Sequence, residues 1–280
     1  MVIELVHVVG SRIELWHDDS TLFRYIYEPG TDPTESPKPY FHPLQTLAGN
    51  EATLYRPHDH PWHTGLAMTS AYLSGENFWG GPTFDRDEGY VHRDNHGRIE
   101  HAAWGEISCD DGVPSLQESL RWVAHDGAVW IHEERRISVG EIDAASGCWR
   151  LDLSFRLENV AGFPLVFGSP TTQGRPQAGY GGLFWRGPLL HGGRDTGSER
   201  ARRADVMGAK SPWLAYRAHD GSGDKTTILF VDGLTNLRHL TKWFVRDELH
   251  ACASCSMFDE EYTLGPDGAR PVLRRRARRR

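Results

Sequence analysis

The clearest pattern along the chain is a strict alternation of apolar and polar residues at positions 149–158, "WRLDLSFRLE". Apolar side chains at every second position are typical of a β-strand with one buried face and one face in water. Rougher runs of this kind, separated by clusters of Gly, Pro, Asp and Asn, occur at residues 2–8, 22–28, 115–123, 128–139, 213–218, 226–231 and 249–257. The pattern predicts many strands joined by turns.

No segment carries a 3.6-residue apolar stripe over several turns, and the 30 glycines and 16 prolines disfavour long helices. We therefore predict an all-β fold, a large antiparallel β-sandwich with few or no long helices. Because the sequence contains no internal repeat or low-complexity linker, residues 1–270 are expected to form a single domain. Two stretches, about 30–100 and 169–212, fit neither strand nor helix and are rich in aromatic residues and histidine, so function is expected there.

The composition indicates a globular protein that is not embedded in a membrane. Hydrophobic residues make up 39% and charged residues 25%, and no apolar run reaches the roughly 18–20 residues that span a bilayer. The N-terminus lacks the features of a secretion signal, so a cytoplasmic location is expected. In the segment "CASC", Cys252 and Cys255 are expected to be inert thiols, since no second C-x-x-C accompanies them.

The formal charge of −7 is distributed unevenly. Six arginines stand in the last seven residues, so residues 1–273 hold 25 basic against 38 acidic groups, a formal charge of −13. An acidic body argues against a nucleic-acid-binding face. Since nothing apolar there could hold the end of the chain down, residues 271–280 are predicted to be a basic, disordered tail.

The segment "RPHDHPWHTG", residues 56–65, concentrates candidate chemistry in His58, Asp59, His60 and His63. Its prolines exclude a helix, and in an extended segment His58 and His60 share a face that His63 approaches after the second proline. The imidazoles could bind a divalent transition metal, with Asp59 as ligand or orienting group. They could equally transfer protons without a metal, because histidine titrates near neutral pH. The sequence leaves both interpretations open.

Other segments suggest a site for a sugar. In "GENFWGG", Asn77 offers a donor and an acceptor beside the flat apolar face of Trp79, and an aromatic platform next to an amide commonly holds a sugar. The segment "PYFHPL" adds His42 as a candidate for the same cleft. No G-x-x-x-x-G-K-[ST], G-x-G-x-x-G or G-x-S-x-G pattern is present, which removes the usual sequence support for nucleotide binding and serine hydrolysis.

Two further segments bring aromatic and cationic side chains together. "GYGGLFWRGPLL" places Tyr180, Trp185 and Arg186 among glycines, as in a loop that lines a cleft. "KWFVRDE" is predicted to be a short strand with Trp243 and Arg246 on opposite faces. Arg246 next to an apolar neighbour could bind a ligand oxygen or form a structural ion pair.

In combination, "YFHPL", "RPHDHPWHTGL", "NFWGG", "GYGGLFWR" and "WFVR" resemble the bacterial PmoA-like family over about residues 35–250. Its members are labelled "methane oxygenase", a label we set aside because particulate methane oxygenation needs a membrane-embedded enzyme. The family is related to galactose-mutarotase-like β-supersandwiches, and its members often accompany sugar-oxidising dehydrogenases. The resemblance therefore implies that fold and a role in carbohydrate metabolism. Such domains usually finish with a strand of alternating apolar residues, and because arginines replace most of it here, the resemblance also implies a missing or shortened final strand and an open sheet edge. The positions it covers are His42, His58, His60, His63, Asn77, Trp79, Tyr180, Arg186, Trp243 and Arg246.

We therefore predict an enzyme that acts on a sugar or sugar-like small molecule by acid/base chemistry of the epimerase, mutarotase or lyase type. His58, His60 and His63 are the expected acid/base residues, and Arg246 and Arg186 are expected to stabilise negative charge that develops on oxygen. The expected substrate contacts are His42, Asn77, Trp79, Tyr180, Trp185, Arg186 and Trp243.

Two alternatives remain: a metal-dependent oxygenase or hydrolase with the same histidines as ligands, and a non-catalytic carbohydrate-binding protein. No nucleic-acid or membrane partner is expected. The sequence leaves open the substrate, the reaction, the presence of a metal, and whether the chain forms a homo-oligomer.

Overall fold

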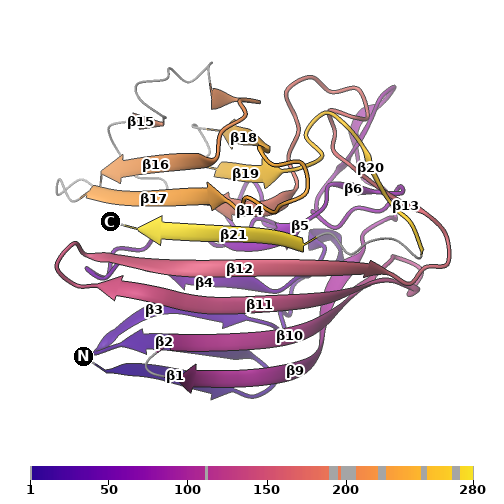
Figure 1. The fold of residues 1–280 in the computed structure, drawn as a ribbon. Coiled ribbons are helices and arrows are strands. Elements are labelled where there is room, and N and C mark those ends of the chain that lie inside the picture. The colour runs from indigo at the N-terminus through magenta and orange to yellow at the C-terminus, as the bar shows by residue number, and fades with distance from the viewer. Residues whose placement is uncertain are drawn as a thin grey trace.

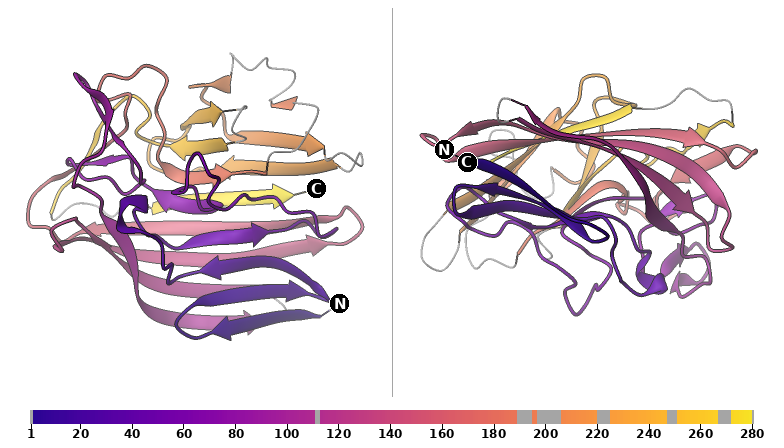
Figure 2. Two further views of the ribbon diagram at one scale, coloured as in Figure 1. Left: turned by 180° about the vertical axis from the view of Figure 1, so that it is seen from behind. Right: turned by 90° about the horizontal axis from the view of Figure 1, so that it is seen from below.

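Two eight-stranded antiparallel sheets, packed face to face, form the computed structural model of the chain (Figure 1; Figure 2, right). The structure describes residues 2–110, 113–188, 195–196, 206–219, 225–246, 251–266 and 272–279. In spatial order the first sheet contains β1 (Ile3–Val8), β2 (Arg12–His17), β3 (Ser20–Ile26), β4 (Tyr40–Leu44), β5 (Leu66–Thr69), β14 (Gly182–Arg186), β19 (Ala251–Cys255) and β18 (Lys242–Arg246). The second contains β15 (Asp195–Thr196), β16 (Trp213–His219), β17 (Lys225–Asp232), β21 (Val272–Arg279), β12 (Cys148–Asn159), β11 (Val129–Asp143), β10 (Val113–Val123) and β9 (Arg98–Asp110).

Smaller elements complete the described part of the chain. A three-stranded sheet contains β20 (Tyr262–Leu264), β13 (Leu165–Gly168) and β6 (Tyr72–Leu73), and a hairpin contains β7 (Thr83–Asp85) and β8 (Gly89–Val91). A single turn of 3₁₀-helix, η1, spans Pro33–Glu35. None of the helical segments that the structure describes is long and apolar enough to cross a membrane. The predicted all-β sandwich is confirmed.

The core lies between the two sheets and follows the alternation in the sequence. In β12 the five apolar side chains of the run 149–158 are each at most 3% exposed, and they pack against residues of the first sheet, including Phe23. The rings of Phe23 and Trp149 stack across the sheets with centroids 6.3 Å apart. Cys252 is a free thiol in this core, and burial raises its pKa, which keeps it in the unreactive thiol form. The side chain of Cys255 lies outside the described part of the structure.

The prediction for residues 271–280 needs correction. Instead of a disordered tail, residues Val272–Arg279 form strand β21 in the interior of the second sheet, hydrogen-bonded to β12 on one side and β17 on the other (Figure 1). A strand in a sheet interior satisfies its backbone groups on both edges, and that pairing does not depend on apolar side chains. The open edge expected from the loss of a final strand is therefore absent at this point of the sheet.

One end of the first sheet, formed by β5, β14, β19 and β18, is covered on both faces. Alternation along β14 and β18 puts Trp185 and Trp243 in the core between the sheets. The same alternation puts Phe184 and Phe244 on the opposite face, in a second apolar cluster. In an antiparallel sandwich this outer face normally meets water, but here other segments of the chain cover it and bury the second cluster.

Candidate functional site

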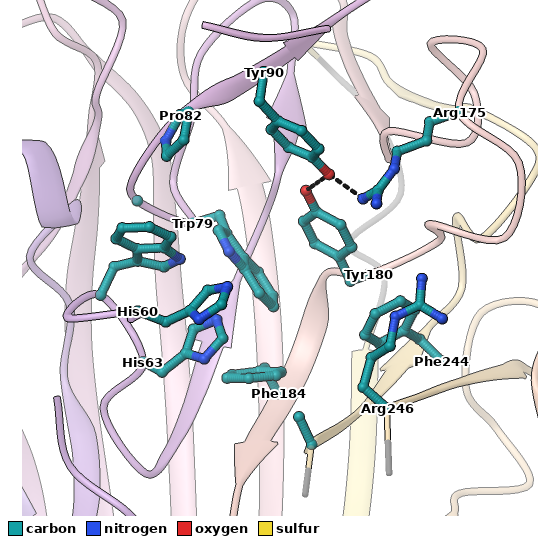
Figure 3. A pocket seen from close by; sticks show the side chains of 13 residues that line it. His60, His63, Trp79, Pro82, Tyr90, Arg175, Tyr180, Phe184, Phe244 and Arg246 are labelled. Atoms are coloured by element: carbon teal, nitrogen blue, oxygen red, sulfur yellow. Dashed lines mark hydrogen bonds between the residues drawn. The ribbon is translucent and has the colours of Figure 1, made fainter. Parts of the chain in front are cut away.

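A cavity of about 280 Å³ lies on this outer face of the first sheet. Its aromatic walls come from strands β14 and β18 and from loops: Trp62, Trp79, Tyr180, Phe184 and Phe244. The stretches 30–100 and 169–212 were predicted to be neither strand nor helix, and this was wrong, because they contain η1, β4 to β8 and β14. Its polar lining consists of His60, His63, Tyr90, Arg175 and Arg246 (Figure 3). A small, concave, largely apolar site with a few converging polar groups is the usual form of a small-molecule site.

The aromatic side chains form a continuous surface. The ring of Trp79 lies 4.5 Å from that of Tyr180 and 4.5 Å from that of Phe184, centroid to centroid. The Tyr180 ring continues to Phe244 at 5.3 Å. Trp79 and Tyr180 are only 8% and 9% exposed, so packing holds the rings of this surface, the aromatic floor of the cavity, in place.

Two tight turns in succession shape the histidine segment. The backbone N–H of His60 donates to the carbonyl of Pro57 at 3.0 Å, and that of His63 donates to the carbonyl of His60 at 3.0 Å. The turns bring the two imidazoles face to face, with ring centroids 4.6 Å apart and planes inclined by 16° (Figure 3). At the start of the segment, the Arg56 guanidinium donates two hydrogen bonds to the buried Glu35 carboxylate, which anchors the turns to η1.

His60 is oriented by its neighbour in the sequence. Its Nδ1 lies 2.7 Å from Oδ2 of Asp59, and because an ionised carboxylate only accepts, Nδ1 carries the proton. Burial raises the pKa of Asp59, but the hydrogen bond from His60 and the charge of Arg186 lower it more, so the carboxyl stays ionised. When this imidazole is neutral, His60 Nε2 carries the lone pair, as a general base requires.

His63 is held in the opposite tautomer. Nη1 of Arg186 lies 3.3 Å from His63 Nδ1, and since a guanidinium only donates, Nδ1 must present its lone pair and Nε2 must carry the proton. Burial, followed by the charges of His60, Arg186 and Lys38, holds the pKa of His63 well below its usual value. His63 is therefore a neutral imidazole near pH 7 and can only donate from Nε2.

Arg186 does not line the cavity but contacts His63, which does. The side chain is 1% exposed, and its Nη2 lies 3.8 Å from Oδ1 of Asp59. Burial lowers the pKa of Arg186 and Asp59 opposes the change, yet a guanidinium remains charged throughout the physiological range. Arg186 thus contacts His63 and also lies near Asp59, which orients His60. The orientations of both imidazoles therefore depend on the same pair of charged side chains.

This arrangement does not fit the metal site that the sequence suggested. Among the described residues no group of three or more His, Cys, Asp or Glu side chains is placed to hold a metal ion. The in-plane lone pairs of two stacked imidazoles run side by side rather than meeting at one point, and His63 Nδ1 faces a guanidinium. His58 is exposed and does not line the cavity. His58, His60, His63 and Asp59 therefore do not form a common ligand set.

The segment that carries Trp79 is fixed by Asn77, which is 2% exposed. Its Oδ1 accepts from the backbone N–H groups of Trp79 and Gly80, at 2.9 and 2.8 Å, and its Nδ2 donates to the Gly81 carbonyl and the Thr83 hydroxyl. Asn77 therefore shapes the cavity wall without lining the cavity itself.

Glycine is required next to Asn77 for packing. Gly80 and Gly81 have φ values of 106° and 66°, in the left-handed region that favours glycine. A Cβ on Gly80 would lie 2.5 Å from a side-chain atom of Trp62, and one on Gly81 would lie 2.6 Å from the indole. The close approach expected from these glycines is therefore made to Trp62, a cavity wall that the sequence did not single out.

A buried lysine, Lys38, also fixes the segment that carries Trp79. Nζ of Lys38 donates to the carbonyls of Glu35, Ser36 and Trp79 at 3.1, 2.7 and 3.0 Å, and the side chain is 3% exposed. Burial lowers the pKa of Lys38 to about 7, and the Glu35 charge raises it in opposition. Lys38 thereby ties the Trp79 segment to η1 by bonds that depend on its protonation.

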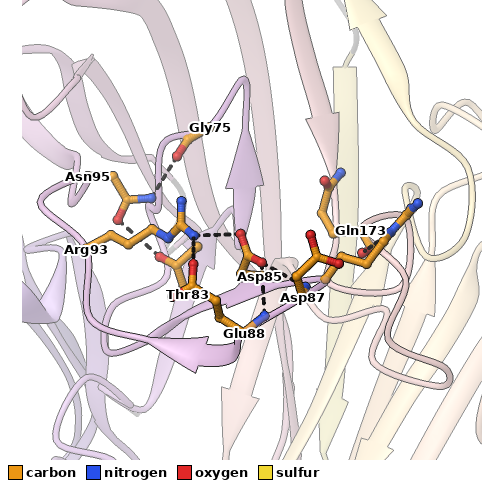
Figure 4. Close-up of polar contacts among 9 residues, drawn as sticks. Gly75, Thr83, Asp85, Asp87, Glu88, Arg93, Asn95 and Gln173 are labelled. Carbon is orange, nitrogen blue, oxygen red and sulfur yellow. Dashed lines mark hydrogen bonds and ion pairs between the residues drawn. The ribbon is translucent and has the colours of Figure 1, made fainter.

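The β7–β8 hairpin brings Tyr90 to the opposite side of the cavity. Within the hairpin, Asp85 accepts from two backbone N–H groups and from Arg93, so the turn is ordered internally (Figure 4). The Tyr90 hydroxyl lies 2.8 Å from that of Tyr180 and accepts a hydrogen bond from Arg175 (Figure 3). Burial, followed by Tyr90, raises the pKa of Tyr180, so this hydroxyl stays protonated.

The structure brings five of the predicted site residues together at the cavity: His60, His63, Trp79, Tyr180 and Arg246. Arg186 and Asn77 lie next to the cavity without lining it. Arg186 contacts His63, and Asn77 fixes the backbone of the segment that carries Trp79. Trp185 and Trp243 lie in the core, where their indole N–H groups donate to the carbonyls of Ala52 and Ser211.

His42 was also predicted to bind substrate, and it lies away from the cavity. Its Nδ1 lies 3.0 Å from the Thr53 hydroxyl, and its ring stacks on Tyr55 at 5.3 Å. Burial, assisted by the charge of Arg24, lowers the pKa of His42 to about 4. These contacts explain the residue as a neutral, structural histidine of β4.

Sequence reasoning missed several lining residues: Trp62, Tyr90, Arg175, Phe184 and Phe244. For Phe184 and Phe244 a signal was present, because alternation places them opposite the neighbouring tryptophans, but it does not say which face holds the core. Tyr90 and Arg175 come from separate loops, and nothing in the local sequence relates them.

The family described as "Family of unknown function (DUF6807)" matches residues 12–276, and the chain belongs to this family. No curated protein and no solved structure matches the chain.

Proposed function

We propose that this member of the DUF6807 family is an enzyme that acts on a sugar or sugar-like small molecule by acid/base chemistry of the epimerase, mutarotase or lyase type. One observation carries the proposal: His60 and His63 lie face to face at the cavity, and their Nδ1 atoms have charged partners of opposite sign, Asp59 and Arg186, which favour opposite tautomers. The aromatic floor supports a sugar ring as the ligand, because the C–H faces of sugars stack on aromatic rings. The resemblance to the PmoA-like family and to mutarotase-like sandwiches supports the same substrate class.

The two histidines suit different tasks. His60 Nε2 takes a proton from the substrate, and Asp59, hydrogen-bonded to Nδ1, stabilises the imidazolium that results. His63, neutral because its pKa is lowered, donates from Nε2–H to a substrate oxygen on which negative charge develops. The imidazolium of His60 then gives the proton back, to the ring oxygen in a mutarotation or to the leaving oxygen in an elimination, so no proton is gained or lost overall.

The test is hydrogen exchange with solvent. Aldoses, ketoses and keto-sugars are incubated with the protein in D₂O, and loss of C–H signals and interconversion of anomers are followed by proton NMR. General acid/base groups contribute at least about 100-fold, so His60→Asn should lower the turnover rate by at least about that factor. His132→Asn, an exposed histidine of β11 in the second sheet, is the matched control and should keep the wild-type rate.

Equal turnover in wild type and His60→Asn would contradict the assignment of the base. Binding of a sugar without any turnover, lost in Trp79→Ala but kept in His60→Asn, would indicate the non-catalytic carbohydrate-binding alternative.

A further inference from the structure

The charges that line the cavity have one sign. Arg175 and Arg246 are both part of its lining, and none of the described lining residues is acidic. This occurs in a chain whose formal charge is −7. A concave, low-dielectric site with cationic walls concentrates anions against the field of an acidic protein.

Both guanidinium groups are held by aromatic rings. Cζ of Arg175 lies 4.8 Å from the centroid of the Tyr90 ring, and Cζ of Arg246 lies 4.9 Å from that of Phe244. Arg175 also donates to the Tyr90 hydroxyl, and Arg246 donates to the carbonyl of Gln177 at 3.2 Å. Stacking uses the face of a guanidinium, whereas its five donors lie in the plane, so a stacked arginine can still direct N–H groups at an anion.

The two arginines and the two histidines lie at opposite ends of the aromatic surface formed by Trp79, Tyr180, Phe184 and Phe244. Figure 3 shows Arg175 and Arg246 beyond Tyr180, and His60 and His63 on the side of Trp79. The cavity of about 280 Å³ is at the lower limit for small-molecule sites, which favours a single sugar ring. A ligand on the floor would therefore have one end at the proton-transferring groups and the other end at the cations.

We propose that the substrate is a monosaccharide-sized sugar acid, whose carboxylate binds at Arg175 and Arg246 while the reacting carbon lies at His60. This inference rests on the function proposed above and specifies its substrate class. A planar carboxylate matches the paired N–H groups of a guanidinium. The usual features of a phosphate site, a helix N-terminus or a lysine, are absent from the described lining of the cavity.

The experiment measures binding by isothermal titration calorimetry, with glucuronate, glucose and glucose 6-phosphate as probes, and with the galacto forms as a second ring configuration. The wild type should bind the uronate at least about tenfold more tightly than the neutral hexose of the same configuration. Arg175→Gln and Arg246→Gln should each remove most of that preference. Arg121→Gln, an exposed arginine of β10 in the second sheet, should leave it unchanged.

Equal affinity for uronate and hexose, or a preference that survives both arginine substitutions, would overturn the inference. Tighter binding of the sugar phosphate than of the uronate, with the same dependence on the arginines, would overturn the choice of carboxylate. The exchange assay separates this inference from the proposed function. Turnover of neutral sugars without a uronate preference refutes only the sugar acid, whereas arginine-dependent uronate binding with no turnover of any sugar supports the anionic site and refutes the acid/base assignment.

Discussion

The buried ammonium of Lys38 leads to a quantitative prediction for stability against pH. In the folded protein burial lowers its pKa from 10.5 to about 7. Between these values the unfolded chain binds a proton that the folded chain does not, so the free energy of unfolding rises with pH. Lys38 therefore destabilises the folded protein most below pH 7, and this destabilisation decreases as the pH rises above 7.

The size of the gain follows from the two pKa values. Integrating the proton-binding difference from pH 7.0 to pH 8.5 gives an increase of about 1.6 kcal/mol in the free energy of unfolding. The range stops at pH 8.5 because Cys252, whose folded-state pKa is raised, begins to oppose the gain as the unfolded thiol ionises. Replacing Lys38 by methionine removes the titrating group, and comparing the two proteins cancels every other group.

The assay is urea denaturation at pH 7.0, 7.5, 8.0 and 8.5 for the wild type, Lys38→Met and Lys210→Met, whose lysine is exposed. The difference between wild type and Lys38→Met should change by about 1.6 kcal/mol across the range, in favour of the wild type at high pH. The difference between wild type and Lys210→Met should stay constant. A constant difference for Lys38→Met would refute the reasoning, because it would mean that the three carbonyls stabilise the ammonium enough to offset burial.

Three further predictions concern residues whose roles the structure reassigns. Trp243→Ala should lower the free energy of unfolding by about 3–5 kcal/mol, as expected for a core indole, and a loss below 1 kcal/mol in urea denaturation would contradict its burial. Asn77→Ala should cost about 2–4 kcal/mol in the same assay, since it removes four hydrogen bonds of a buried loop, whereas an unchanged midpoint would show that the loop is held by other contacts. The pKa of His42 is about 4 in the folded protein, against 6.5 for a free histidine, so the free energy of unfolding falls as the pH drops below about 6.5. Between pH 7 and pH 5 the wild type should lose about 2 kcal/mol more than His42→Gln in urea denaturation, and equal losses in the two proteins would refute this.

The strands of this fold could be predicted because the alternation is local. In β12 every apolar residue of the run 149–158 is buried, as the pattern requires. Alternation also gave the relative orientation of residues in β18, where Trp243 lies in the core and Phe244 at the cavity. The sequence could not say which face is which, because here both faces of the sheet are apolar.

The site could be predicted only where its chemistry is concentrated in a short segment. His60 and His63 come from one short segment, so their proximity could be predicted, but the segment consists of two tight turns and is not extended as assumed, and His58 lies outside the cavity. The distinction between them was not, because it depends on Asp59 for one ring and on Arg186, far along the chain, for the other. Tryptophan was favoured as the sugar platform, yet two of the three candidate indoles, Trp185 and Trp243, fill the sandwich core.

Strand β21 has a consequence for how the protein folds. It follows every other described strand in the chain but lies between β12 and β17, so until it docks both neighbours present an unpaired edge. Pairings over such long sequence separations form slowly, and partly folded molecules with open edges are prone to join one another. The run "RRRARR" within this strand gives it a density of like charge that discourages self-pairing between separate molecules. The same arginines that hide the strand pattern in the sequence are therefore expected to reduce aggregation of partly folded molecules in which β21 has not yet paired.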